Sequence, residues 1–248
     1  MEQLFPIVNQ SFPYVSGLSM QRASVTTLSF TPGYCRDSNN IIDLQLTSAI
    51  TCNAAVNGVN GLDSGSLANT TWYYGFIIGD SKGIKTTATL LSTSKTAPTL
   101  PAGYDSFRWV GVALTSGAAQ FNDYLTKDDG LTRRTIWTSA ITALSGGSAT
   151  TITTVAMTSG VPPLSDVMAL CQVLFTPNAA GNSVSFNYGG ATNADINLSG
   201  VVASQIQQAQ LELPIQLVSN VPEIVYINSA ASCSTTLTVK GFSYNVSA

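Results

Sequence analysis

The side chains that could do acid–base chemistry in this chain are aspartates. Paired carboxylates can hydrolyse glycosidic bonds without histidine, and the chain contains no histidine. The candidates are Asp63, Asp80, Asp105, Asp123, Asp128, Asp129, Asp166 and Asp195. Most of them adjoin Gly, Ser or Asn, where an aspartate typically serves a turn by bonding its own backbone. No spacing distinguishes an acid from a nucleophile, so the sequence predicts no catalytic residue and a protein that is not an enzyme.

The other reactive residues point to no cofactor or metal site. Without histidine, Ser-His-Asp and Cys-His machinery is excluded. None of the four cysteines, Cys35, Cys52, Cys171 and Cys233, lies in a Cys-x-x-Cys pair. Cys171 alternates with apolar residues, which predicts a buried thiol, whereas a Cys35–Cys52 disulfide is left open. The Asn/Asp-rich stretches 37–40 and 193–197 offer oxygen ligands for calcium, but they match turns better than an EF-hand.

Charge and hydropathy exclude two classes of partner. Only 9% of the residues are charged, the net charge is −3, and the one basic pair that stands out is Arg133-Arg134. Nucleic-acid binding needs a concentrated positive surface, so no nucleic acid is expected. We find no 18-residue apolar run and no basic, apolar leader, which predicts neither a membrane span nor a signal peptide. The chain is expected to stay in the cytoplasm where it is made until lysis or assembly moves it.

Aromatic residues gather in the stretch 67–111, where they could stack on sugars or fill a β-core. In the "TWYYGF" run, successive side chains point to opposite faces of a strand. Trp72, Tyr74 and Phe76 then share one face, and Tyr73 and Ile77 share the other. We expect one set to be core and the remaining face to be available as an interface.

The elements that position these side chains are predicted to be strands. Segments such as "IIDLQLTS" (41–48) and "QLELPIQL" (210–217) alternate apolar and polar residues between Gly, Pro, Asn and Asp turns. The fold class predicted is all-β, with two antiparallel β-sandwich (jelly-roll-like) domains and a short extended N-terminal arm. The one helix candidate is the Ala/Leu-containing stretch 138–144. We expect Leu44, Leu46, Trp72, Tyr74, Val173 and Leu213 to be largely buried.

Two boundaries divide the chain into an arm at 1–21, a β module at 22–126 and a C-terminal sandwich at 127–248. The charged, Gly-containing stretch 125–134 is typical of a linker between domains. The arm is apolar but interrupted by Pro6, Pro13 and Gly17. It is expected either to dock on another protein or to pack as a strand on its own domain.

Residues 22–125 resemble a module of tailed-bacteriophage structural proteins. In that family a Gly-Leu-Asp-x-Gly turn precedes a Trp-Tyr strand, and a "LLSTSxTAPTLPxGYxxxRRIG" segment follows. Here Gly61-Leu62-Asp63-Ser64-Gly65 and Trp72-Tyr73 match the first part, and "LLSTSKTAPTLPAGY" (90–104) matches the second. The second arginine of the family's pair is replaced by Trp109. Looser similarity extends to "TSGVPPLSDVMALCQVLF" (158–175) and to the closing strands from residue 211.

The resemblance implies a virion component assembled in the host cytoplasm: a tail-fibre, tail-attached or receptor-binding protein, or a head-decorating one. It also implies a homotrimer that contacts other proteins of the tail, collar or head. Two alternatives remain, a glycan-binding adhesion module that recognises host surface glycans and a capsule-degrading enzyme. A low-charge, Ser/Thr/Asn-rich β-fold suits many copies packed side by side, because like charges would repel.

Overall fold

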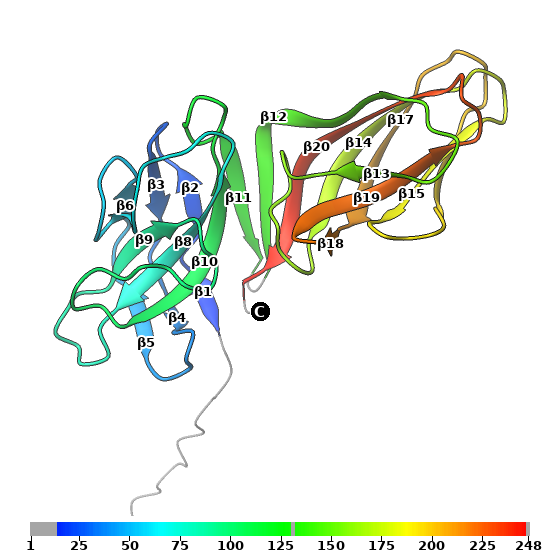
Figure 1. Ribbon diagram of the computed structural model, residues 1–248. Coiled ribbons are helices and arrows are strands. Elements are labelled where there is room, and N and C mark those ends of the chain that lie inside the picture. Colours follow the sequence, from blue (N-terminus) through cyan, green and yellow to red (C-terminus); the bar gives the residue numbers. More distant parts are fainter. Residues whose placement is uncertain (1–13, 130–131, 247–248) are drawn as a thin grey trace, which may run out of the picture.

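The computed structural model describes residues 14–129 and 132–246. It is an elongated molecule of two lobes, both built from strands (Figure 1). The described part of the chain contains no helix, and so no helical segment able to cross a membrane. The all-β prediction is therefore confirmed. The helix candidate at 138–144 is wrong, because these residues continue a long strand.

The N-terminal lobe contains ten strands in three sheets, with the orders β1-β4-β5, β2-β3-β6 and β10-β8-β9-β7. Their bounds are β1 Val15–Gly17, β2 Met20–Arg22, β3 Thr27–Phe30, β4 Gly33–Arg36, β5 Asp43–Leu46, β6 Ile50–Asn53, β7 Gly61–Leu62, β8 Trp72–Gly79, β9 Ala88–Ser92 and β10 Ser106–Leu114. All pairs are antiparallel except β7 with β9, which is parallel.

Strand β8 is buried on both faces, which explains the aromatic stretch. On one face Gly75 and Gly79 leave room for the two small sheets: a Cβ at Gly75 would lie 2.5 Å from Met20 Sδ, and one at Gly79 would lie 2.3 Å from Leu44. On the opposite face Tyr74 and Phe76 are 5% and 0% exposed. The alternation predicted for this strand is therefore observed, and both sets of side chains are core.

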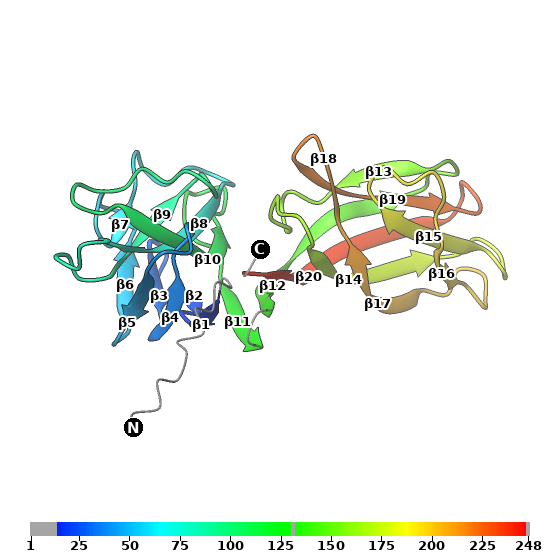
Figure 2. The same cartoon turned by 90° about the horizontal axis from the view of Figure 1, so that it is seen from below.

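The C-terminal lobe is a sandwich of two sheets, with the orders β11-β12-β20-β14-β17 and β13-β19-β15-β16, and with β18 paired to β19 (Figure 2). The bounds are β11 Tyr124–Asp129, β12 Thr132–Gly147, β13 Thr153–Ala156, β14 Met168–Thr176, β15 Ser183–Tyr188, β16 Ile196–Ser199, β17 Gln207–Pro214, β18 Gln216–Val218, β19 Val221–Asn228 and β20 Ser234–Asn245. The inward side chains of β14 alternate along the strand as predicted, Cys171 among them.

Two long strands, β12 and β20, connect the sandwich to the N-terminal lobe (Figure 1). Their pairing shifts register between Ile136 and Ile141, and again towards Gly147. Such irregularities bend a strand and increase its twist. One end of the pair thus belongs to the sandwich, and the other end presents Trp137, Phe242 and Tyr244 to the N-terminal lobe.

Seven rings form a continuous aromatic seam between the lobes. Trp72, Tyr74 and Trp109 come from the N-terminal lobe, and Tyr124, Trp137, Phe242 and Tyr244 come from the large sheet of the C-terminal lobe. Ring centroids lie 5.5 Å apart for Trp109 and Tyr244 and 5.7 Å apart for Trp72 and Phe242. Edge-to-face and tilted contacts of this kind stabilise aromatic pairs beyond the area that they bury.

The loop between β13 and β14 covers this seam. The indole N–H of Trp72 donates to the Thr158 carbonyl at 3.0 Å, and the indole N–H of Trp137 donates to the Gly160 carbonyl at 3.0 Å. A buried indole N–H needs such a partner, because an unpaired donor away from water is costly.

Of the six residues predicted to be core, Trp72 is half-buried and the other five are buried.

The two predicted domain limits both fall inside strands. Residue 21 lies in β2, which pairs with β3, and residue 126 lies in β11, which pairs with β12. The described end of the predicted arm therefore packs as strands on its own lobe, whereas residues 1–13 lie outside the described residues. Residues 125–129 and 132–134 lie in β11 and β12, which pair with each other in the large sheet.

Arg133, a charged residue of this stretch, is buried and makes an internal contact. Its side chain is 1% exposed, donates to the Gly17 carbonyl at 2.6 Å and lies 3.5 Å from Asp128. Asp128 in turn accepts from the Ser19 hydroxyl. The ion pair thus holds the β1–β2 turn against the β11–β12 hairpin, so the charged residues serve an internal contact.

Replacing Trp137 by Ala is expected to lower the free energy of unfolding by about 3–5 kcal/mol, because a large buried ring and its hydrogen bond to Gly160 are lost. Tyr188, which is 46% exposed, provides the control, and Tyr188→Ala should change stability by no more than about 0.5 kcal/mol. Urea titration followed by circular dichroism measures both. Equal effects of the two substitutions would show that the seam does not stabilise the fold.

Limited trypsin digestion is expected to cut first after Lys82 or Lys85, which lie in an exposed loop. Cleavage after Arg133 should be slow, because its side chain is buried and its backbone is paired on both sides. Intact-mass spectrometry of the early fragments identifies the sites. Early fragments ending at Arg133 would contradict a closed hairpin.

Candidate functional surface

Two of the aspartates, Asp80 and Asp105, line one small recess of about 240 Å³ in the loops beside β8 and β10. Asp80 accepts from the backbone N–H groups of Lys82, Ile84 and Lys85. Asp105 accepts from the backbone and hydroxyl of Ser81, at 2.7 and 2.5 Å.

These hydrogen bonds determine the charge of both groups. The backbone N–H of Lys82 is the main cause that lowers the pKa of Asp80, and the Ser81 hydroxyl is the main cause that lowers the pKa of Asp105. A retaining or inverting glycosidase needs one carboxylic acid whose pKa is raised, so that it can protonate the leaving group. Two carboxylates with lowered pKa values supply no such acid.

The remaining aspartates are scattered over turns and ion pairs. Asp63 accepts from the Thr99 backbone, Asp123 pairs with Arg22, and Asp195 bonds Asn187 and Asn193. Asp166 lies in the β13–β14 loop, and the side chain of Asp129 lies outside the described residues.

Of the two calcium candidates, 37–40 is a turn and 193–197 runs into β16. Asp37 uses one carboxylate oxygen to accept from the backbone N–H groups of Ile41 and Ile42, at 2.6 and 2.9 Å. Among the residues that the structure describes, no group of three acidic or thiol side chains is placed to hold a metal ion.

All four cysteines are free and buried. Cys35 lies in β4 and Cys52 lies in β6, in different sheets, so the disulfide left open by the sequence is not formed. The Cys52 thiol instead donates to the Gly61 carbonyl at 3.4 Å. Burial raises the pKa of Cys35, Cys52 and Cys171 to about 12, which makes these thiols poor nucleophiles.

The motif segments of residues 61–65 and 90–104 bind one another. Gly61 and Leu62 pair in parallel with Leu90 and Leu91, and the Asp63 carboxylate accepts from the Thr99 backbone at 3.1 Å. The Tyr104 hydroxyl donates to the Thr86 carbonyl at 3.1 Å. These side chains fasten loops to a sheet, which is a structural use and not a catalytic one.

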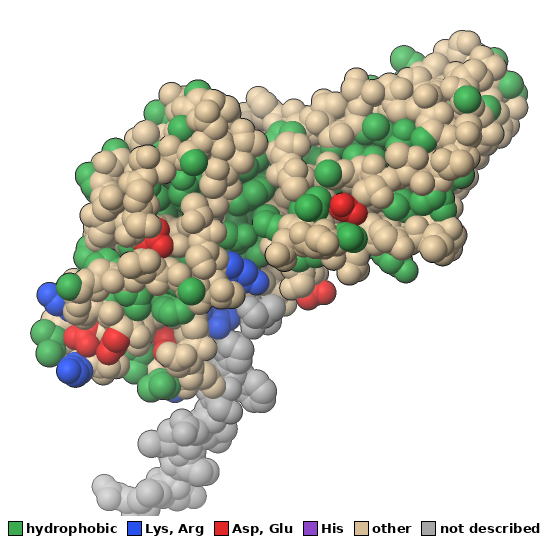
Figure 3. All heavy atoms as spheres, in the orientation of Figure 1, with side chains coloured by type: hydrophobic (Ala, Val, Ile, Leu, Met, Phe, Trp, Pro, Cys, Tyr) green, Lys and Arg blue, Asp and Glu red, His purple; other side chains and the backbone are tan. Residues whose placement is uncertain are grey.

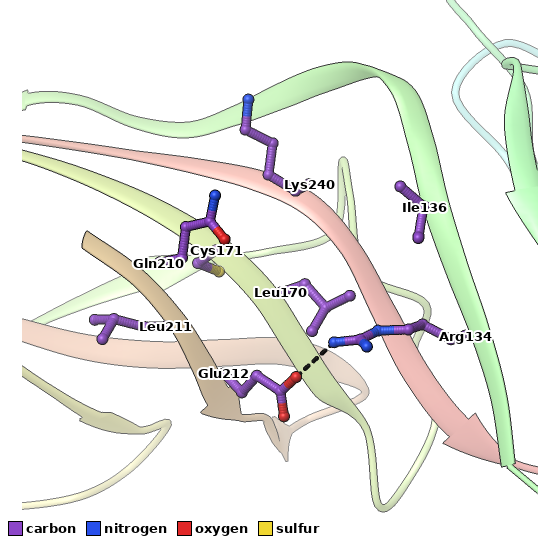
Figure 4. A pocket seen from close by; sticks show the side chains of 8 residues that line it. All are labelled: Arg134, Ile136, Leu170, Cys171, Gln210, Leu211, Glu212 and Lys240. Carbon is purple, nitrogen blue, oxygen red and sulfur yellow. Dashed lines mark hydrogen bonds and ion pairs between the residues drawn. The ribbon is translucent and has the colours of Figure 1, made fainter. Parts of the chain in front are cut away.

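A shallow hollow of about 430 Å³ lies on the outer face of the large C-terminal sheet, lined by Arg134, Ile136, Leu170, Cys171, Gln210, Leu211, Glu212 and Lys240 (Figure 4). Arg134 of β12 reaches across β20 and β14 to Glu212 of β17, at 2.6 Å. Lys240 extends away from this pair. Arg134 and Glu212 neutralise each other, Lys240 adds one positive charge, and Leu170, Leu211 and Ile136 supply an apolar floor.

A second hollow, the basic recess, lies at the edge strand β10 and has a volume of about 510 Å³. Its residues come from three segments: Ser38 and Asn39 from the β4–β5 loop, Lys95 and Thr96 from the β9–β10 loop, and Phe107, Arg108 and Trp109 from β10. The Ser38 backbone N–H donates to the Phe107 carbonyl at 2.7 Å, so the first loop is fixed to the edge of the strand.

Two cations lie in the basic recess. Lys95 Nζ stands 4.6 Å from the centroid of the Trp109 ring. Arg108 is 8% exposed and donates to the Val246 carbonyl at 2.8 Å, whereas its Nε finds no partner among the described residues. Burial is the main cause that lowers the pKa of Lys95, and the nearby charge of Arg108 adds to it. Sequence reasoning missed this site, because its cations are thirteen residues apart in a chain with few charges.

Charged side chains are sparse on the face shown in Figure 3, and most of them lie on the N-terminal lobe and at the junction of the lobes. A pair of neighbouring cations therefore stands out from a mostly neutral surface.

Comparison with known proteins adds little to this geometry. No protein-family model matches the chain, and no curated protein matches it. A carbohydrate-binding module of Cellvibrio mixtus lichenase 5A, solved with cellotriose, is 15% identical over 50% of this chain and 86% of its own, with a TM-score of 0.21. A mutant VP2 protein from particles of infectious bursal disease virus is 11% identical over 93% of this chain and 69% of its own, with a TM-score of 0.15. Both scores are too low to support an inference about function.

The native thiols are expected to be inert towards Ellman's reagent at pH 8. All four are buried, and the raised pKa of Cys35, Cys52 and Cys171 favours their protonated form in the folded state, whereas an unfolded thiol has a pKa of about 8.5. All four should react in denaturant. The same difference should make the free energy of unfolding fall as the pH rises above about 8.5 towards 12. Fast reaction of any thiol in the native protein would contradict the burial described here.

Proposed function

We propose that the chain is a non-enzymatic structural protein of a bacteriophage virion, namely a tail-fibre, tail-attached or receptor-binding component. The observation that carries the proposal is the use of the motif residues. Those that resemble the phage module tie loops to the β7–β9 pair, and the aromatic seam joins this lobe to the sandwich. A stiff, elongated body with few surface charges suits a part that is repeated on a particle.

The alternative roles differ in how well the geometry supports them. A head-decorating protein would use the same stiff body, and only its place and number on the particle would differ. A capsule-degrading enzyme is disfavoured by the lowered pKa values of Asp80 and Asp105. A glycan-binding role has one specific observation in its favour, the basic recess.

Quantitative mass spectrometry of purified virions tests this proposal. The chain should be present in particles at a few multiples of three copies if it belongs to the tail or collar. Dozens to hundreds of copies would assign it to the head. A chain that is abundant in the lysate but missing from purified particles would refute the proposed virion role.

We further propose that the protein is a homotrimer whose copies meet through the outer face of the large C-terminal sheet. This face presents the half-buried side chains Met168, Leu170 and Leu174 between uncharged Gln and Thr side chains. The Arg134–Glu212 pair neutralises the hollow at its centre. Closed symmetry would limit such a contact to a defined number of subunits.

Light scattering during size-exclusion chromatography is expected to give the mass of a trimer. Leu170→Glu should shift it to a monomer without loss of the circular dichroism spectrum, because a charge would be buried in the contact. Ile84, which is 76% exposed in the β8–β9 loop of the N-terminal lobe, provides the control, and Ile84→Glu should leave the trimer intact. A monomeric wild-type protein would refute the proposed trimer. A Leu170→Glu variant that remains trimeric would show that the subunits meet through another surface.

A further inference from the structure

We propose that the basic recess binds a saccharide unit that carries a carboxylate. The inference rests on the recess itself and does not require the virion role. The proposed ligand class is an acidic sugar, and the site consists of Ser38, Asn39, Lys95, Thr96, Phe107 and Arg108.

The charge of the recess calls for an anion. Lys95 and Arg108 lie close enough for one charge to lower the pKa of the other, and neither forms an ion pair with a carboxylate in the described part of the chain. Asp37 lies near Arg108 and Asp166 lies near Lys95, but neither carboxylate is within ion-pair distance of these cations, and the oxygens of Asp37 accept from three backbone N–H groups. Two half-desolvated cations without an ion-pair partner are costly, and a bound carboxylate would relieve that cost.

The donors are suited to a planar anion. An arginine guanidinium offers several N–H groups that match a carboxylate, and Arg108 lines the recess with one Nη fixed by the Val246 carbonyl and with its Nε covered. Lys95 is held over the Trp109 ring at 4.6 Å, which restrains its ammonium group. The floor of the recess is therefore a prepared cationic site.

The rim of the recess favours a ligand rich in hydroxyl groups. Ser38, Asn39 and Thr96 are exposed there and carry one amide and two hydroxyls that can both donate and accept. Phe107 is half-buried and offers an apolar side against which the C–H face of a sugar can pack. A volume of about 510 Å³ falls in the range of small-molecule sites, about 300–1,000 Å³.

The hollow in Figure 4 is a weaker candidate for the same role. Its arginine already pairs with Glu212 at 2.6 Å, and none of its lining residues carries a ring. The two cations without an ion-pair partner and the aromatic ring are therefore the features of the basic recess that select an acidic sugar.

Calorimetric titration and intrinsic tryptophan fluorescence, to which Trp109 contributes with Trp72 and Trp137, test the proposal on the full-length protein. The probes are glucuronic acid and N-acetylneuraminic acid, with glucose as the neutral sugar and with acetate and inorganic phosphate as simple anions. At least one acidic sugar should bind about tenfold or more tightly than each of these three, because a charge-assisted hydrogen bond and the rim contacts act together. Binding should weaken as the salt concentration rises.

Two matched variants locate the binding. Lys95→Gln should weaken binding of the acidic sugar about tenfold, whereas Lys82→Gln, in an exposed loop outside the recess, should not change it. Arg108 also holds the Val246 carbonyl, so Lys95 is the primary test, and the melting temperature of each variant checks the fold.

Three results would overturn the assignment. Equal affinity for glucose would show that the cations play no part, and acetate or phosphate binding as tightly as the acidic sugars would reduce the recess to a simple anion site. An unchanged affinity in Lys95→Gln would place the binding elsewhere. Absence from virions would leave these results untouched, so the two proposals fail separately.

Discussion

The rest of the structure depends on the packing of two indole rings between the lobes, the buried Trp137 and the half-buried Trp72. Each ring carries one N–H donor, and that of Trp137 must be satisfied because water is excluded from it. The carbonyls of Thr158 and Gly160 accept these two hydrogen bonds, which fixes the β13–β14 loop over the seam. The same rings pack against Phe242. Loop, large sheet and N-terminal lobe are therefore held in one arrangement by one cluster.

The geometry of the basic recess depends on the same aromatic cluster. Trp109 packs against Tyr244 in the seam and carries Lys95 over its ring. Arg108, its neighbour, donates to the Val246 carbonyl next to the end of β20. Residues of the C-terminal lobe thus hold the two cationic side chains indirectly. A change in the seam is expected to alter the recess even where it touches none of the lining residues.

Sequence patterns predicted the structural features that depend on residues close together in the chain. Alternation identified the strands, the two faces of Trp72–Ile77 and the burial of Cys171, because side chains two residues apart share a face. The same reasoning failed for Arg133, whose partner carbonyl at Gly17 is 116 residues away, and for the stretch 138–144, which bends within β12. It also missed the recess, since Ser38, Lys95 and Arg108 meet only after two sheets have packed. One signal was present: Arg108-Trp109 stands where the resembling family has two arginines.

The length of β12 and β20 has a mechanical consequence. These strands run from the junction of the lobes into the far part of the sandwich (Figure 1). If β12 and β20 were pulled in opposite directions along their axes, the many hydrogen bonds between them would share the force at once. Antiparallel strands pulled apart at one end separate bond by bond, whereas strands pulled past one another resist together. The long β12–β20 pair therefore resists sliding of one strand past the other better than peeling from one end.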